Sequence, residues 1–258
     1  MPTSNRPEPV RLAVIGGSGL YRLGLGPVTT THQVNTPFAD EPVDVFEEQT
    51  AAGPVWFLPR HGEHHTVAPH RINYRANVWA LHSLGCNSIV AINATGGISA
   101  GMIPGRLVIP DQIIDYSYGR EHTFITDEHS LAHHIDFTNP FDPLLMECLA
   151  GSVKQARLEY RLGGVYGCTQ GPRLETAAEI RRMYRDGCDI VGMTGMPEAA
   201  LCRELGLRYA MLALVVNRGA GLGGGEISLD EIRQVLVQGV DGIRIVLRHC
   251  CQMLLKPA

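Results

Sequence analysis

The sequence predicts a single α/β domain over residues 1–258, with a largely parallel or mixed sheet flanked by helices. Short apolar runs rich in β-branched residues alternate with longer stretches of helical periodicity, which is the pattern of this class. Hydrophobic residues make up 45% of the chain, so a sizeable core can form. No proline- or serine-rich linker and no internal repeat divides the sequence, which favours one domain over two.

In the first half of the chain, the run 10–15 ends at two glycines, as a buried strand entering a tight turn does. Apolar runs predict further strands at 28–34, 43–46 and 55–58. Residues 73–84 place apolar positions on one face of a helix, and Gly85 is the expected stop. The remaining expected elements of this half are a buried strand at 88–93, a turn at 94–97, and strand fragments at 107–109 and 113–114.

In the second half, a long helix is predicted at 143–162 and a strand at 165–169. A helix at 175–184 ends before Gly187, and a short strand follows at 190–191. A helix at 198–205 precedes the clearest buried strand, the apolar run 209–216. A closing helix spans 229–255, with Ser228 or Asp230 as its candidate N-cap.

Composition excludes several classes of protein. The formal net charge of −4 argues against nucleic acid or an anionic membrane as the main partner, because both need a clustered basic surplus. The polar residues 1–9 are expected to form a flexible tail rather than a signal peptide. Seven cysteines without any C-x-x-C spacing argue against a disulfide scaffold or a zinc ribbon. We therefore expect a cytoplasmic protein with reduced thiols.

The basic residues are almost all arginine. Lys154 and Lys256 are the only lysines among 22 basic residues, which argues against Schiff-base chemistry and a phosphate-loop lysine. Any bound anion is therefore expected to be held by arginine, backbone N–H groups or hydroxyls.

Polar or glycine-rich residues follow the predicted strands at five places. Ligands bind at the carboxyl ends of strands in open α/β sheets, so these five places predict one common site. They are 16–19, 60–61, 94–97, 193–194 and 217–219.

Two of these motifs leave alternatives open. Gly17-Ser18-Gly19 lacks the third glycine of a dinucleotide fingerprint, because position 22 is Arg22, so either an anion-binding turn or an ordinary turn remains. Four histidines within ten residues indicate a metal site, an oxyanion site with Arg60, or a solvated loop. These histidines are His61, His64, His65 and His70.

Two further residues also allow more than one interpretation. Glu175 is either an ordinary acid in the first turn of a helix or a carboxylate aimed into a pocket. Asn217 follows eight apolar residues, so a buried strand delivers an amide to its own end. A buried amide needs partners, since leaving one unpaired costs about 1–3 kcal/mol.

Five motifs follow one another along the chain: Ile15-Gly-Gly-Ser-Gly-Leu-Tyr21, Arg60-His-Gly-Glu-His-His-Thr66, Pro69-x-x-x-Asn73-Tyr-Arg-Ala-Asn77, Gly171-Pro-Arg173 and Gly192-Met-Thr-Gly-Met-Pro-Glu198. Together they resemble the trimeric purine nucleoside phosphorylase and methylthioadenosine phosphorylase family, from about residue 11 to 252. The resemblance implies a partly barrel-like mixed sheet, a homotrimer, and phosphorolysis of a nucleoside by inorganic phosphate as co-substrate. It implies neither a metal nor an organic cofactor.

Carried over residue by residue, the resemblance implies roles for particular side chains. The phosphate-binding set is Ser18, Arg60, His61, Ala94 and Thr194. Met193 is expected beneath the ribose, and the purine is expected to face Glu175, Asn217, Arg218 and Gly219. Asn217 and His61 are the expected catalytic pair, the first acting on the departing purine and the second on the phosphate.

This chain differs from the methylthioadenosine enzymes of that family at positions that indicate which base and which 5′ group the substrate carries. The methylthioadenosine enzymes carry an Asp-x-Asp pair where this chain has Asn217-Arg218-Gly219. An ionised Glu175 only accepts hydrogen bonds, so it suits the N1–H of a 6-oxopurine and opposes the N1 lone pair of adenine. Leu229 gives an apolar wall for a methylthio group, and His134 of an adjacent subunit is expected to cap it.

The expected substrate is therefore 5′-methylthioinosine. A general inosine and guanosine phosphorylase, or a methylthioadenosine phosphorylase, is the alternative within the family. Outside it, the rivals are a nicotinamide-dependent oxidoreductase and a metal-binding sensor built on the histidines.

Overall fold

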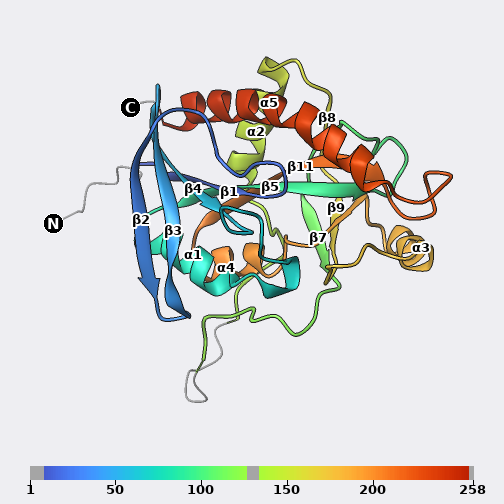
Figure 1. The fold of residues 1–258 in the computed structure, drawn as a ribbon, viewed down its shortest axis with the longest axis horizontal. Helices are drawn as coiled ribbons and strands as arrows, with labels where there is room; N and C mark the ends of the chain where they lie inside the picture. Colours follow the sequence, from blue (N-terminus) through green and yellow to red (C-terminus); the bar gives the residue numbers. More distant parts are fainter. Residues whose placement is uncertain (1–8, 127–133, 256–258) are drawn as a thin grey trace.

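In the part of the chain that the structure describes, eleven strands form one mixed sheet (Figure 1). The computed structural model describes residues 9–126 and 134–255, so nearly all of the predicted N-terminal tail lies outside the described residues. The strands are β1 (Leu12–Gly16), β2 (Val28–Thr36), β3 (Ala39–Thr50), β4 (Gly53–Pro59), β5 (Ser88–Gly97), β6 (Leu107–Ile109), β7 (Gln112–Asp115), β8 (Tyr160–Leu162), β9 (Val165–Cys168), β10 (Ile190–Gly192) and β11 (Arg208–Arg218). The helices are α1 (Tyr74–Ser83), α2 (Pro143–Gln155), α3 (Ala177–Arg185), α4 (Glu198–Glu204) and α5 (Leu229–Leu254), with a short 3-10 turn at Pro69–Arg71.

The sheet is built around β5. Its main path is β2-β3-β4-β1-β5-β10-β9-β7, and β11 pairs with both β5 and β6. Residues Ser88–Ala91 of β5 pair in parallel with β1 on one side and with β11 on the other. Further along, Gly96 and Gly97 pair antiparallel with β10. The ends of β1, β5, β10 and β11 are therefore brought to one region of the sheet.

Helices cover both faces of this sheet (Figure 1). Because side chains alternate along a strand, Leu12 and Val14 of β1 pack into the cluster that contains residues of α2 and α5. Ala13 and Ile15 point the other way, into the cluster that contains residues of α1 and α4. Two cores on opposite faces of one sheet confirm the predicted single α/β domain.

The strand predicted at 43–46 extends over Ala39–Thr50, and the helix predicted at 175–184 begins at Ala177. Two other predicted elements were wrong in part. The helix predicted at 143–162 ends at Gln155, and Arg157 has a positive φ of 56°. Residues Tyr160–Leu162 instead form β8, which pairs in parallel with β6. The turn predicted at 94–97 is the end of β5, since these residues pair with β11 and, at Gly96 and Gly97, with β10. In both segments, pairing with strands that are distant in the sequence determines the secondary structure.

The cysteines and the helices bear on two further expectations. All seven cysteines are buried and free, and the Sγ atoms of Cys148 and Cys250 lie 3.4 Å apart, joined by a hydrogen bond and not by a disulfide. Among residues 9–126 and 134–255, no helix has both the length and the apolar composition that a membrane span needs.

Candidate active site

The five predicted strand ends meet at one cavity of about 470 Å³. The whole predicted phosphate-binding set lines it: Ser18, Arg60, His61, Ala94 and Thr194. The side chains expected at the sugar, base and 5′ end line it as well: Met193, Glu175, Asn217 and Leu229. Strand ends far apart in the sequence thus form a single pocket, as the sequence predicts.

Three predicted residues lie outside the lining of this pocket. The Arg218 guanidinium donates to the carbonyl oxygens of Ser99 and Met102, at 3.0 and 2.8 Å, so it holds the turn that follows β5. Gly219 is buried, and a Cβ there would meet Ile180 at 3.2 Å. His134 is exposed on its own chain.

The turn after β1 depends on a close approach of two backbones. A Cβ on Gly17 would lie 2.4 Å from the Ile92 carbonyl oxygen and 3.0 Å from Arg60 Nη1. Only glycine fits there without a shift of β5. The turn is closed by the Leu20 N–H, which donates to the Gly17 carbonyl at 3.1 Å. Gly17 thus lies against the Arg60 side chain, and Ser18, the next residue, lines the same cavity as Arg60.

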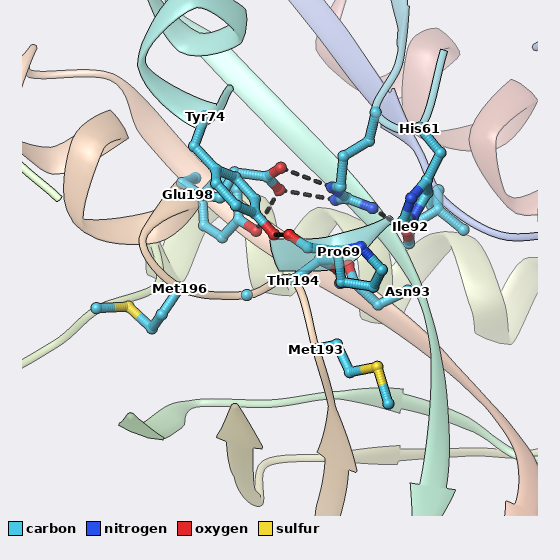
Figure 2. A network of polar contacts seen from close by, with 12 residues as sticks. His61, Pro69, Tyr74, Ile92, Asn93, Met193, Thr194, Met196 and Glu198 are labelled. Carbon is cyan, nitrogen blue, oxygen red and sulfur yellow. Dashed lines mark hydrogen bonds and ion pairs between the residues drawn. The ribbon is translucent and has the colours of Figure 1, made fainter. Parts of the chain in front are cut away.

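Arg60 is buried against a carboxylate that the sequence analysis did not single out. Its Nε and Nη2 donate to the two oxygens of Glu198, each at 2.7 Å, and Nη1 donates to the Ile92 carbonyl at 3.1 Å. Figure 2 shows Glu198 at the centre of these contacts. The Tyr209 hydroxyl also donates to Glu198, at 2.9 Å. The carboxylate raises the pKa of Arg60 even though burial opposes it, so the guanidinium stays charged and fixed.

His61 is held as a neutral imidazole. Burial, together with the nearby charge of Arg60, lowers its pKa to about 4. Its Nδ1 lies 2.8 Å from the Val67 carbonyl oxygen, so Nδ1 carries the proton and donates it there. Nε2 is then left with a lone pair, and His61 is an acceptor toward any ligand in the pocket.

The other histidines of that motif do not gather around a metal. His65 lines the pocket, where its ring lies 4.5 Å from that of His61 and 5.2 Å from that of Tyr21. Within the described part of the chain, no group of three or more histidine, cysteine, aspartate or glutamate side chains is arranged to hold a metal ion. These rings form an aromatic wall instead.

Asn93 is a further pocket residue that the sequence analysis did not single out. Its Nδ2 donates to Thr194 Oγ1 at 2.8 Å, and both side chains are buried (Figure 2). Because the Thr194 oxygen accepts this bond, its own proton is free to be donated to a ligand. Asn93 Oδ1 is buried and has no hydrogen-bond partner among the described residues. A polar residue at the end of the apolar run 88–93 was the available signal.

Glu175 lies just before α3 rather than in its first turn. Thr176 is the N-cap, and Thr176 and Glu179 form a capping box. Arg173 is paired with Glu179 at 2.7 Å, so the helix start is already satisfied. Thr169 Oγ1 donates to Glu175 Oε1 at 2.6 Å, which leaves the other carboxylate oxygen for a ligand. Glu175 therefore lines the pocket and does not lie in the first turn of α3.

Asn217 and the start of α5 complete the pocket. Asn217 Nδ2 donates to the Arg218 carbonyl at 2.7 Å, which fixes the orientation of the amide. One N–H and Oδ1 remain available to a ligand. On α5, Leu229, Ile232 and Leu236 present an apolar surface to the same cavity. The site thus joins an anion-binding end, a polar end and an apolar wall.

Residues 11–251 match the family described as the phosphorylase superfamily. The chain is 46% identical over 235 residues to a Pseudomonas syringae pv. tomato protein named "Probable S-methyl-5'-thioinosine phosphorylase", covering 91% of this chain and 96% of that protein. It is 41% identical over 236 residues to the 6-oxopurine nucleoside phosphorylase of Pyrococcus furiosus, covering 88% of this chain and 86% of that one.

A solved structure supports the same assignment. Methylthioadenosine phosphorylase from Schistosoma mansoni, in complex with adenine, superposes with a TM-score of 0.89 at 30% identity, covering 95% of this chain and 91% of that one. The fold, the extent of the family match and the identities to these relatives agree, and the chain belongs to the phosphorylase superfamily.

Proposed function

We propose that the protein catalyses the phosphorolysis of 5′-methylthioinosine to hypoxanthine and 5-methylthioribose 1-phosphate. A phosphate oxygen attacks C1′ of the sugar, the bond from C1′ to the purine N9 breaks, and its electron pair moves into the purine. The relatives named for S-methyl-5'-thioinosine and for 6-oxopurine nucleosides support this reaction. The reaction needs inorganic phosphate but neither a metal nor an organic cofactor.

The anion-binding end suits a phosphate beneath C1′. Ser18 and Thr194 supply hydroxyl donors, Ala94 supplies a backbone contact, and the charged Arg60 adds attraction. Neutral His61 offers Nε2 as an acceptor, so it suits a phosphate oxygen that still carries a proton. Holding the nucleophile in line with C1′ contributes to the rate by positioning, while Met193 lies against the ribose.

One observation carries the choice of base: Glu175 and Asn217 line the same pocket. Each already makes one hydrogen bond within the protein, Glu175 to Thr169 and Asn217 to the Arg218 carbonyl, and each has further polar atoms for a ligand. The free carboxylate oxygen of Glu175 accepts N1–H of hypoxanthine. The remaining N–H of Asn217 donates to O6 or N7, where negative charge gathers as the purine leaves. A donor of this kind is worth about 2.7–4 kcal/mol in the transition state.

The 5′ end of the substrate is assigned to the apolar surface of α5. Leu229 lies there in place of a polar partner for a 5′-hydroxyl, and Ile232 and Leu236 extend that surface. His134 is exposed on its own chain, which suits the proposal that it caps the pocket of a neighbouring subunit in a homotrimer. We further propose a cytoplasmic enzyme, in keeping with seven free cysteines.

The test is a comparison of phosphate-dependent rates on methylthioinosine, methylthioadenosine, inosine and guanosine. The proposal expects the highest kcat/KM with methylthioinosine. A preference for inosine or guanosine would support the general 6-oxopurine enzyme, and a preference for methylthioadenosine would contradict the roles given to Glu175 and Asn217. Absence of phosphate-dependent cleavage of all four would overturn the proposed reaction.

The Glu175→Gln variant tests the base-reading carboxylate directly. An amide can turn to face either N1–H or the N1 lone pair, so the ratio of kcat/KM for methylthioinosine over methylthioadenosine should fall by about 100-fold or more, since polar mismatches reach about 10⁴. Glu179→Gln is the matched control, because Glu179 lies in the first turn of α3, close to Glu175 in the sequence but outside this pocket. An unchanged ratio in Glu175→Gln would contradict the assignment.

A further inference from the structure

Arg120 is a buried arginine behind the wall of the pocket, and the reaction described above gives it no role. It is 7% exposed and does not line the cavity. All the partners that the structure gives its guanidinium are uncharged: four backbone carbonyls, the Gln170 side chain and the Tyr74 hydroxyl. A charge buried in this way is costly unless its hydrogen bonds are fixed, so these partners are held firmly.

The guanidinium joins two strand ends. Nη2 donates to the carbonyls of Thr169 and Gln170, at 3.1 and 2.8 Å, just past the end of β9. Nη1 donates to the Met193 carbonyl at 2.8 Å and to the Met196 carbonyl, on the segment that follows β10. The planar fork of arginine spans both segments at once, which a lysine ammonium cannot do with the same geometry.

Each of these segments delivers a different part of the substrate site. Thr169 bonds Glu175, the proposed reader of the purine. Met193 and Thr194 lie against the proposed sugar and phosphate positions, and Figure 2 shows them on the same segment as Met196. A third contact runs from Arg120 to the Tyr74 hydroxyl at 3.3 Å, and that hydroxyl donates to the carbonyl of Pro69, another lining residue.

We propose that Arg120 is a positioning residue that sets the distance between the purine-binding and phosphate-binding walls of the pocket. The inference rests on the proposed phosphorolysis, because that reaction requires both substrates to be held in register. A displacement of about 1 Å between reacting groups costs about 100-fold in rate. Arg120 therefore acts on catalysis through the segments after β9 and β10, without touching the substrate.

The test compares Arg120→Lys and Arg120→Ala with the parent enzyme. Both variants should lose about 100-fold in kcat/KM, as for a displacement of about 1 Å, with higher KM for phosphate and for nucleoside alike. Millimolar guanidinium chloride should restore part of the activity of Arg120→Ala and none of that of Arg120→Lys, where the ammonium fills the site. Arg75→Met is the matched control, since Arg75 is a half-buried arginine beside Phe38 and lies outside the pocket.

Each other outcome contradicts the inference in a recognisable way. If the KM rises for only one of the two substrates, Arg120 supports only one wall of the pocket and does not set the distance between the two. Activity within threefold of the parent, or the same loss in Arg75→Met, removes the positioning role. If circular dichroism shows that both Arg120 variants are unfolded, the residue is needed for folding, and the proposed role in setting the distance between the two walls is wrong. A parent enzyme without phosphorolysis overturns the proposed function instead, and with it the premise of this inference.

Discussion

At the scale of single residues, the pair of Arg60 and Glu198 combines stability with function. Both side chains are 1% exposed, and the carboxylate meets the guanidinium through two bonds of 2.7 Å. Such a pair gains little over well-packed apolar residues, but breaking one partner leaves a charge in the interior. Glu198 therefore fixes the direction in which Arg60 can present its remaining N–H groups to an anion.

The Glu198→Gln variant should destabilise the fold by about 3–5 kcal/mol, because the Arg60 charge loses its buried partner. The KM for phosphate should rise at the same time, since the guanidinium is no longer held. Urea unfolding and initial-rate kinetics measure the two effects. In Glu159→Gln, which breaks an exposed pair with Arg106, the loss should stay below about 1 kcal/mol. Equal losses in the two variants would contradict the argument.

At the scale of elements, the first turns of α5 determine which side chains line one side of the cavity, where the proposed function places the 5′ end of the substrate. Ser228 caps the helix, with its hydroxyl accepting from the Glu231 N–H at 3.3 Å, so the cap is Ser228 rather than Asp230. This start places Leu229 at the cavity, although its side chain is 59% exposed in the single chain. Under the proposed function, the identity of one residue at this helix start sets the polarity of the 5′ subsite.

Leu229→His should shift the enzyme from methylthio substrates toward nucleosides with a 5′-hydroxyl. The imidazole offers that hydroxyl a hydrogen bond and removes the apolar wall that suits a methylthio group. Because one good polar match is typically worth about 1.5 kcal/mol, the ratio of kcat/KM for inosine over methylthioinosine should rise about tenfold or more. Val237→His, on the same helix and outside the pocket, is the control. A ratio that moves equally in both variants would show an effect of surface charge only.

The predictions were correct where the local sequence pattern determines the secondary structure. They were wrong where pairing with a distant strand determines it. The run 209–216 and the glycine stops of two helices follow from the sequence alone, and the structure confirms them. Nothing between Gln155 and Tyr160 signals a break, because neither glycine nor proline lies there. Residues Tyr160–Leu162 become a strand only because β6 offers an open edge to pair with.

The candidate site divides in the same way. The strand-end rule brings Ser18, Arg60, Thr194 and Asn217 together without any knowledge of the fold. Glu198 could not be found by that rule, because it lies at the start of α4 and not at the end of a strand. Asn93 does end a predicted strand, but its partner could not be predicted from the sequence. Glu198 lies 138 residues from Arg60, and Asn93 lies 101 residues from Thr194. Only the folded sheet makes them neighbours.

At the scale of the whole molecule, the neutral state of His61 links the site to acid stability. Its pKa falls from 6.5 to about 4 on folding, so the unfolded chain binds the proton more readily than the native protein. The stabilisation that this provides is complete above pH 6.5 and is lost as the pH falls through 4. Burial also lowers the pKa of His65, which acts in the same direction.

The free energy of unfolding should therefore fall between pH 6.5 and 4, and His61→Gln should show a shallower fall. Between pH 6.5 and 4, the parent should lose at most about 3.5 kcal/mol more than the variant, since each pKa unit corresponds to about 1.4 kcal/mol. Urea unfolding curves at several pH values measure it. Parallel curves for the parent and the variant would contradict the assignment of His61 as a buried neutral base.

The double pairing of β5 has a consequence for how this molecule opens. Residues Ser88–Ala91 are hydrogen-bonded to strands on both sides, and the same strand continues into Ala94 at the floor of the cavity. Amide protons along this ladder should be among the slowest to exchange with deuterated water, because local fluctuations cannot release a central strand. Any opening of the cavity is therefore expected in the segments around β5, because β5 separates from its neighbours only when the whole protein unfolds.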